Sequence, residues 1–238
     1  MDAWNRAGEM GRGQDLAYES LRQRLISGHY PPGTQLREEP LAREFGLSRT
    51  PIRAALRRLV EDGLATADLG QGIRTAQWSE SDIEETFQIR ILLEPYGAKL
   101  AAERGGAALT EGLRACNRQM AAALSESGRD AIVTIQEINR TFHHLLLDHA
   151  CSPRLRGILD TLIEMPVVTR AFFLFTAEEL EQSLRHHEDL TRAVEARDGD
   201  LAREVMQLHL RTSRSRFMRH RLSRADGHAV VSSASDRT

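Results

Sequence analysis

The chain has 238 residues, of which 41% are hydrophobic and 28% are charged, and its formal net charge is −2. This composition is typical of a globular protein with one or two domains, and it lacks the overall basic charge of many nucleic-acid binders. The apolar runs are too short to span a bilayer, residues 1–13 lack the apolar core of a secretory signal, and the two cysteines form no CxxC pair. We therefore expect a cytoplasmic protein with no membrane partner.

The N-terminal third of the sequence has the pattern of a small helical domain. Residues 1–13 are polar and glycine-rich, which predicts a flexible arm. After the arm, apolar residues recur at helical spacing in three stretches, and Gly46 and Gly63 stand where the second and third stretches end. The three predicted helices cover residues 14–27, 38–45 and 49–62.

A change to extended structure follows the third helix. Residues 64–78 contain two short pieces of strand character on either side of a turn with Gly70 and Gly72. Three helices followed by a β-hairpin predict a winged helix-turn-helix over residues 14–78, in which the hairpin is the wing.

The rest of the sequence has a helical pattern, so we expect a mainly α protein. Residues 79–222 predict an all-α antiparallel bundle, and residues 223–238 are small and polar, which predicts a disordered tail. Thr176 and Glu179 have the spacing of a capping box at the start of the fifth helix. The six predicted helices of the bundle cover residues 79–104, 110–125, 130–149, 153–175, 176–197 and 199–220.

The third helix of the winged domain combines an arginine face with an apolar face. Arg49, Arg53 and Arg57 are spaced by four residues, so they share one side of the helix. The residues largely opposite to them are Ile52, Ala55, Leu56 and Leu59. Such a helix can enter the major groove, where an arginine fork matches the two acceptors of guanine, and its N-terminus after Ser48 offers backbone N–H groups to a phosphate. A solvated charged surface is the alternative interpretation.

Short motifs surround this helix in a fixed order. They are Pro-Pro-Gly at residues 31–33, Leu-Arg-Glu at 36–38 and Gly-Leu-Ser-Arg-Thr-Pro-Ile-Arg at 46–53. Together with the glycine-containing wing, they closely resemble the DNA-binding domain of the GntR superfamily. The resemblance implies double-stranded DNA as a partner, with Gly70 and Gly72 at the wing tip near the minor groove. The contact residues that it implies are Arg37, Ser48, Arg49, Thr50, Arg53, Gly70 and Gly72. A first-turn helix hydroxyl is an equally good interpretation of Thr50.

Three of the histidines stand where a helical bundle could bring them together. Asn139 and His143 are four residues apart on the third predicted helix of the bundle, and His187 and His209 lie on the fifth and sixth. Side chains from several helices build metal sites in bundle cores, and neutral imidazole binds zinc, nickel or manganese. From spacing alone, an exposed or hydrogen-bonded histidine is the commoner interpretation.

Residues 81–217 resemble the FCD ligand-binding domain that follows the GntR helix-turn-helix in the FadR subfamily, and six helices fit its VanR-type group. The matching pieces are Arg-Ile-Leu-Leu-Glu-Pro at 90–95, Asn-Arg-Thr-Phe-His at 139–143, His187 with Ala193 and Asp198, and His209-Leu210. The resemblance implies a divalent metal ion, zinc, nickel or manganese. The ligands that it implies are Asn139, His143, His187 and His209.

Asn139 departs from the family pattern, in which many members have an aspartate. A neutral amide oxygen is a weaker ligand than a carboxylate, so we expect a lower metal affinity. We expect the adjacent His144 and His186 to point away from the site. Arg90 is the candidate to bind the other end of a carboxylic-acid ligand, and a salt bridge to Glu94 or Glu85 is the alternative interpretation of this arginine.

These resemblances imply a ligand-responsive transcription regulator rather than an enzyme. We expect a repressor that binds an inverted-repeat operator as a homodimer and responds to a small carboxylic acid, with residues 76–80 linking the two domains. The apolar runs at residues 89–93 and 159–168 suggest that the first and fourth helices of the bundle pair in the dimer. Two alternatives are a sensor for which the metal itself is the signal and a metal-dependent enzyme with a DNA-binding segment.

Overall fold

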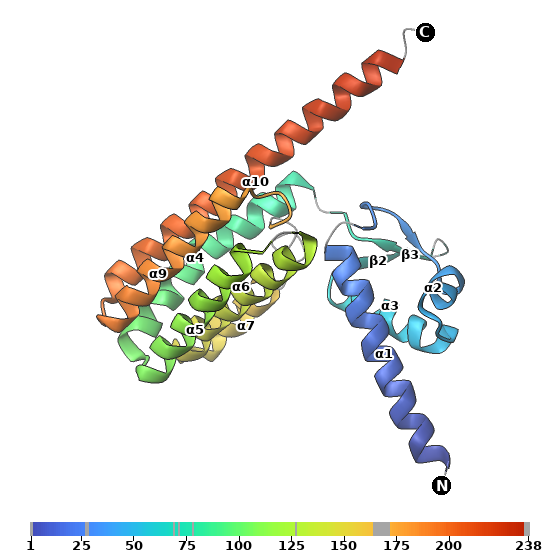
Figure 1. Ribbon diagram of the computed structural model, residues 1–238, viewed down its shortest axis with the longest axis horizontal. Helices are drawn as coiled ribbons and strands as arrows, with labels where there is room; N and C mark the ends of the chain where they lie inside the picture. The colour runs from blue at the N-terminus through green and yellow to red at the C-terminus, as the bar shows by residue number, and fades with distance from the viewer. Residues whose placement is uncertain are drawn as a thin grey trace. The chain divides into compact units, whose positions relative to one another are not determined.

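The computed structural model divides the chain into two compact units, and the boundary between them follows Ser79. Figure 1 traces the elements of both units. Among the described residues, no helix is long and apolar enough to cross a membrane. The described residues are 2–26, 29–68, 70, 72–77, 79–126, 128–163 and 172–235.

The N-terminal unit is a winged helix-turn-helix with a small sheet. Its elements are α1 (Asp2–Ile26), β1 (Gln35–Leu36), α2 (Glu38–Phe45), α3 (Arg49–Glu61), β2 (Ala65–Asp68) and β3 (Gly72–Thr75). The strands are antiparallel in the order β1-β3-β2, so the predicted hairpin gains a third strand that the sequence did not indicate. β1 has only two residues, and Leu36 pairs with Ile73. A strand of that length is too short to show alternation.

Two left-handed glycines set the ends of the helices that flank the turn. Gly46 ends α2 at φ 64° and Gly63 follows α3 at φ 68°, a backbone conformation that glycine adopts at little cost. Ser48 is the N-cap of α3, as expected, although its side chain makes no capping hydrogen bond. The buried face of α3 includes Ile52 and Leu56, which anchor the helix and leave the opposite face to solvent.

The first helix is longer than the sequence predicted. α1 already begins at Asp2, so residues 2–13 are helical where a flexible arm was expected. The prediction gave too much weight to the glycines in this stretch. A glycine in a helix costs about 1 kcal/mol relative to alanine, which neighbouring helix-forming residues can offset.

The C-terminal unit is a bundle whose described part contains six helices. They are α4 (Glu80–Arg104), α5 (Ala107–Leu124), α6 (Arg129–His149), α7 (Pro153–Ile163), α9 (Ala177–Glu195) and α10 (Gly199–Ser235). α4 packs along α10, and α5 packs against both α6 and α9. The apolar core between them includes the fully buried Leu113, Met120 and Phe142.

Two predictions for this unit were wrong. α7 ends at Ile163, and Phe172–Leu174 form a turn, so the fourth helix does not reach residue 175. The apolar run there resembles a helix in composition, and composition cannot separate a buried helix from other buried segments. In addition, α10 continues to Ser235, where a disordered tail was expected. Alanine and arginine in that stretch favour a helix, which the polar composition concealed.

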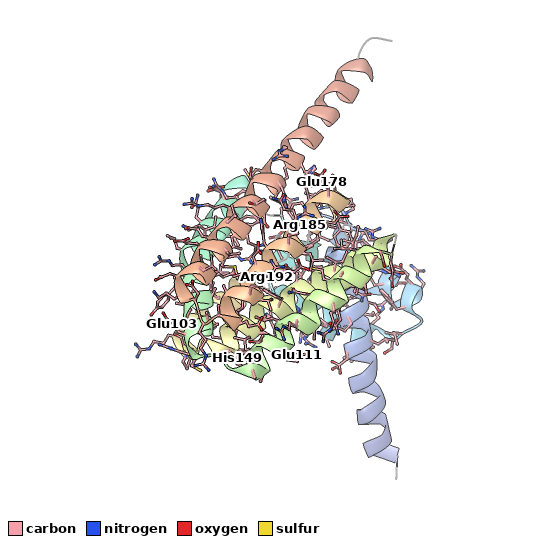
Figure 2. The ribbon with its side chains drawn as sticks, turned by 60° about the vertical axis from the view of Figure 1, so that its left-hand side comes forward. Glu103, Glu111, His149, Glu178, Arg185 and Arg192 are labelled. Atoms are coloured by element: carbon pink, nitrogen blue, oxygen red, sulfur yellow. The ribbon has the colours of Figure 1, made fainter. Side chains whose placement is uncertain are left out.

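A complete capping box fixes the start of α9. The Thr176 hydroxyl accepts a hydrogen bond from the Glu179 backbone N–H, and the Glu179 carboxylate accepts one from the Thr176 backbone, which completes the predicted capping box. From this fixed start, Glu178, Arg185 and Arg192 project from the outer face of the helix (Figure 2). His187 lies on the opposite, buried face, so the cap sets the register that directs it inward.

Candidate DNA interface and metal centre

The predicted DNA-contacting residues of α3 lie on its exposed face. Arg49 and Thr50 begin the helix, Arg53 follows one turn later, and all three side chains are exposed. Ile52 and Leu56 are buried on the other side. The helix therefore has the amphipathic arrangement that insertion into a major groove requires.

Two exposed arginines of α3 are paired with carboxylates in the first turn of α2. Arg53 donates from Nε and Nη2 to the two carboxylate oxygens of Glu38, at 2.7 and 2.8 Å. Arg49 donates from Nη2 to Glu39 at 2.8 Å. The hydrogen bonds from Arg53 lower the pKa of the Glu38 carboxyl, and the same pairing raises the pKa of Arg53. Sequence reasoning did not identify these two glutamates.

The other predicted DNA-contacting residues are also exposed. Arg37 is the N-cap of α2 and donates to the Gln35 side chain at 3.0 Å. Ser48 is exposed at the turn before α3. Gly70 and Gly72 both have positive φ, at 81° and 83°, and a Cβ at Gly70 would meet no atom within 4 Å. The backbone at the wing tip is thus open to the close approach of another molecule.

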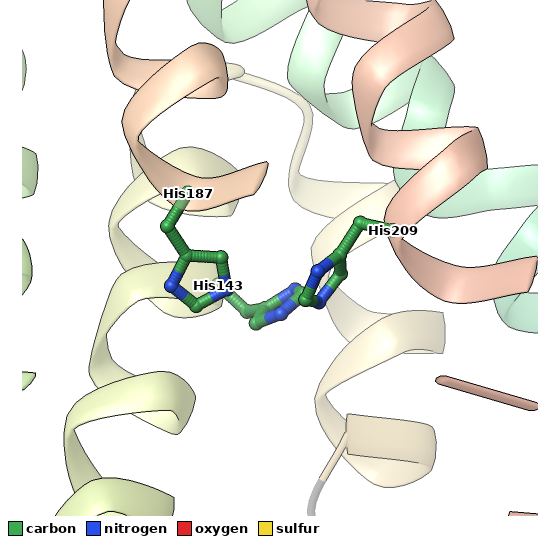
Figure 3. Close-up of side chains that lie close together, drawn as sticks. All are labelled: His143, His187 and His209. Carbon is green, nitrogen blue, oxygen red and sulfur yellow. The ribbon is translucent and has the colours of Figure 1, made fainter. Parts of the chain in front are cut away.

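Three histidines from three helices converge inside the bundle. His143 of α6, His187 of α9 and His209 of α10 each offer a ring nitrogen, and these atoms all lie within 4.8 Å of one another (Figure 3). All three side chains are at most 3% exposed. Clustered imidazole nitrogens are typical ligands of metal ions with tetrahedral or octahedral coordination.

Two neighbours hold the rings in place. Phe142 stacks on His187 with ring centroids 4.0 Å apart and planes 5° from parallel. The buried Glu94 of α4 accepts a hydrogen bond from His143 Nδ1 at 2.6 Å and also accepts one from Arg90 Nε. An ionised carboxylate only accepts, so His143 carries its proton on Nδ1 and leaves Nε2 for the cluster. A metal-binding histidine commonly has such a second partner.

Burial and charge set the protonation of these groups. Burial alone would raise the pKa of the Glu94 carboxyl, but the Arg90 guanidinium and His143 outweigh it and lower this pKa to about 2. Burial moves the pKa values of His187 and His209 well below the usual range, and the neighbouring histidines add to the effect. Both rings are therefore neutral, which is the form that binds a metal ion.

The polar atoms around the cluster fit a bound cation. His143 Nε2, His187 Nε2, His209 Nδ1 and Asn139 Oδ1 are buried and have no hydrogen-bond partner within the described parts of the chain. A buried polar atom without a partner costs about 1–3 kcal/mol. The three histidine nitrogens among these atoms are of the kind that a metal ion binds. Asn139 lies one turn before His143 on the buried side of α6, as expected.

One of the two histidines that were expected to point away does not. His144 lies beside Asp160 of α7, with 3.3 Å between Nδ1 and the carboxylate. His186, however, is buried, and its ring meets that of His209 edge-on with centroids 5.9 Å apart. α9 packs against both α5 and α10, so residues a quarter-turn apart on it are both covered.

Arg90 and Glu94 form a buried ion pair next to the histidine cluster. The buried pair matches the alternative interpretation of Arg90 as a salt-bridge partner of Glu94. The sequence contained a signal for Glu94, because an acid one turn after an arginine on a predicted helix is a common ion pair. Nothing in the sequence indicated that His143 would share it.

Comparison with known families accounts for both units. Residues 14–74 match the description "Bacterial regulatory proteins, gntR family", and residues 85–212, more than half of the chain, match "FCD domain". The protein is a GntR family regulator with a C-terminal FCD domain. The winged helix-turn-helix is thus its DNA-binding unit, and the histidine cluster lies in its FCD domain.

Relatives of this GntR regulator are transcription regulators, not enzymes. The chain is 28% identical over 200 residues to the HTH-type transcriptional repressor GlaR of Escherichia coli, covering 82% of this chain and 91% of the relative. It is 25% identical over 190 residues to the gluconate operon transcriptional repressor of Bacillus licheniformis, covering 76% and 75%. The structure of E. coli McbR/YncC shares the fold, with a TM-score of 0.70, 21% identity, and 87% and 97% coverage.

Proposed function

We propose that this GntR regulator is a repressor that binds an inverted-repeat operator as a homodimer and releases it when a small carboxylic acid binds at a metal ion in the FCD domain. The observation that supports the proposal most is the buried cluster of His143, His187 and His209, whose unpaired nitrogens fit a ligand-binding centre in the unit that does not bind DNA. Two relatives are named as repressors, which supports the direction of regulation.

In the DNA-binding unit, we assign the contacts to the N-terminal half of α3 and to the wing. Arg49, Thr50 and Arg53 are exposed in the first two turns of α3, where arginine can read guanine and the helix N-terminus can bind phosphate. We assign contacts with the DNA backbone to four further exposed residues: the helix N-caps Arg37 and Ser48, and the wing glycines Gly70 and Gly72.

In the FCD domain, His143, His187, His209 and Asn139 would hold zinc, nickel or manganese. The bound ion would supply a Lewis-acidic centre for a carboxylate, because all four ligands are neutral and leave its charge uncompensated. Glu94 holds His143 in the required tautomer, and Arg90 keeps Glu94 ionised. Contact between Arg90 and the far end of the acid stays a prediction, since this side chain is buried and paired.

The bundle has exposed apolar side chains that support a homodimer. Leu92 and Tyr96 of α4 are 73% and 51% exposed, and Ile158 of α7 is 51% exposed, although α4 and α7 pack on each other. These are the first and fourth helices that the sequence indicated. Residues 164–168 of the expected apolar run lie outside the described residues. Exposed apolar groups on two adjacent helices are typical of an interface between copies.

The test is a titration of labelled DNA from the region upstream of the protein's own gene. Binding is measured with and without zinc, nickel and manganese, and with and without a panel of small carboxylic acids. We expect salt-sensitive binding in the nanomolar range that one acid releases. Release by a metal ion alone would favour a metal sensor. Binding that no acid and no metal changes would contradict the proposed effector site.

A further inference from the structure

We propose that Glu38 and Glu39 are positioning residues of the DNA interface, and that Glu38 makes Arg53 the base-reading side chain of α3. The inference rests on the proposed docking of α3 in the major groove. It goes further in giving roles to two acidic residues that would face DNA, with sequence discrimination assigned to Glu38. Their carboxylates are in place before DNA arrives, since both ion pairs exist in the unbound protein.

The geometry of the Arg53–Glu38 pair leaves free the edge of the guanidinium that can bind guanine. The carboxylate occupies the edge formed by Nε and Nη2, with hydrogen bonds of 2.7 and 2.8 Å. Two parallel bonds fix the plane and direction of the guanidinium. The remaining edge, formed by Nη1 and the second hydrogen of Nη2, is the fork that matches O6 and N7 of guanine. The Arg53 side chain is 55% exposed, so this edge is accessible.

The Arg49–Glu39 pair is built less tightly. A single hydrogen bond of 2.8 Å joins Arg49 Nη2 to Glu39, and both side chains are more than half exposed. One bond leaves the guanidinium free to turn about it. An arginine of this kind suits a phosphate, which accepts a donor from many directions, better than the edge of one base. The two pairs therefore predict different roles for the two arginines.

The position of these acids argues against a role in affinity alone. A carboxylate close to bound DNA repels phosphates and competes for the arginine, so it lowers non-specific binding. As a stabilising element it contributes little, because exposed ion pairs are worth about 0–1 kcal/mol. Holding the guanidinium in one orientation favours binding only to DNA that has a guanine at the matching position. Glu38 thus lowers the affinity for DNA in general and increases the discrimination between sequences.

The experiment compares specific and non-specific binding. A duplex selected from a random-sequence library by the wild-type protein and a scrambled duplex of equal length are titrated by fluorescence anisotropy at several salt concentrations. The variants are Glu38→Gln, Glu38→Asp and Glu39→Gln. The matched control is Glu44→Gln, also on α2, because Glu44 pairs with Arg24 of α1 and not with α3. Circular dichroism verifies that each variant is folded.

For Glu38→Gln, we expect the ratio of specific to scrambled affinity to fall at least about fivefold, the lower range for a bidentate base contact. Binding to the scrambled duplex should strengthen, and its salt dependence should steepen by up to about 0.9 in log–log slope as Arg53 becomes free for a phosphate. Glu38→Asp keeps the charge but shortens the reach, so it should lower the ratio without steepening the slope. Glu39→Gln should change the ratio less than Glu38→Gln.

Two different failures can be distinguished. If the wild-type protein selects no sequence, the proposed docking of α3 is wrong and the inference falls with it. If the wild-type protein selects a site but Glu38→Gln and Glu38→Asp keep its specificity ratio, as Glu44→Gln should, then the docking stands and the positioning role is wrong.

Discussion

The two units of this regulator differ in the burial and the pairing of the polar side chains at their candidate sites. In the DNA-binding unit, Arg49 and Arg53 are exposed, and each has a carboxylate partner on α2. In the FCD domain, His143, His187 and His209 are buried, and each has a ring nitrogen without a partner in the described structure. One unit satisfies its polar groups before its ligand arrives, whereas the other leaves them unsatisfied.

The difference in burial decides what each arrangement costs. An exposed ion pair can be broken for about 0–1 kcal/mol, so the arginines can move from carboxylate to DNA at little expense. A buried acceptor without a partner costs about 1–3 kcal/mol for as long as the site stays empty. The DNA-binding face is therefore stable alone, while the histidine cluster gains stability from an occupant. Substitutions and metal addition can test this contrast in stability.

Removing the aromatic support of the cluster should have the largest effect. Phe142 is fully buried and stacks on His187. We expect Phe142→Ala to lower the free energy of unfolding of the FCD domain by about 3–5 kcal/mol, measured by denaturant titration. As a control, Leu208→Ala at a side chain that is 54% exposed should change it by no more than about 0.5 kcal/mol. Equal effects would show that the cluster is not part of a packed core.

Adding a metal ion should stabilise the FCD domain selectively. At a hundredfold excess over Kd, binding contributes about 2.7 kcal/mol, which corresponds to a rise in Tm of roughly 5–10 °C. His187→Ala should abolish the rise, because it removes one ligand. His149→Ala, at a histidine of α6 that hydrogen-bonds to the Leu145 carbonyl, should retain it. Thermal melts with and without zinc measure the difference, and an unchanged rise in His187→Ala would contradict the site.

Removing Arg53, the proposed base-reading side chain, should weaken DNA binding and leave the stability of the protein unchanged. We expect Arg53→Ala to lower operator affinity by roughly tenfold to a hundredfold. The melting curve should not change, since the side chain is exposed. Arg118→Ala on α5 removes the same charge from another exposed ion pair and should bind the operator like the wild-type protein. An operator affinity that Arg53→Ala leaves intact would exclude this side chain from the interface.

Asn139, the proposed amide ligand, can be converted to a carboxylate. Asn139→Asp should increase zinc affinity by roughly tenfold, because an anionic oxygen is a stronger ligand than an amide oxygen. Competition with a chelating dye measures the affinity. Thr141→Asp places the same charge on the exposed side of α6 and should leave it unchanged. If both variants behave alike, Asn139 does not contact the ion.

The smallest effect is expected from one hydroxyl in the DNA-binding unit. Tyr18 donates a hydrogen bond to Asp62 at 2.5 Å, and burial together with this bond raises its pKa to about 12. Tyr18→Phe should cost about 1 kcal/mol at neutral pH. Between pH 10 and 12 the unfolded phenol loses its proton and the folded one does not, so wild-type stability should fall with rising pH. The variant should lack this contribution in denaturant titrations.

Local signals in the sequence predicted the DNA-binding unit well. Gly46, Gly63 and the N-cap Ser48 bracket α2 and α3, so these helices agree with the prediction to within a residue. The apolar spacing of α3 also predicted which side is buried. The pairing of Arg53 with Glu38 escaped prediction, because it depends on the crossing of two helices and not on spacing within one.

The histidine cluster shows where such reasoning ends. The sequence placed His143, His187 and His209 on three helices, and their convergence requires the packing of α6, α9 and α10. Glu94 was interpreted only as a partner of Arg90, because spacing within α4 indicates contacts within that helix. Its contact with His143 of α6 depends on how the two helices pack. His186 was expected to point away from the site because it lies a quarter-turn from His187, but α9 packs against both α5 and α10.

The origin of the three histidines on separate helices gives a bound ion a further role as a removable crosslink. It would join α6, α9 and α10 at one point, so α10 could not detach from the bundle while the ion stays in place. Amide hydrogens of α9 and α10 would then exchange with deuterated solvent only after the ion leaves. Proteolytic lifetime depends on the same opening, so the abundance of this regulator would follow the supply of the metal even at constant synthesis.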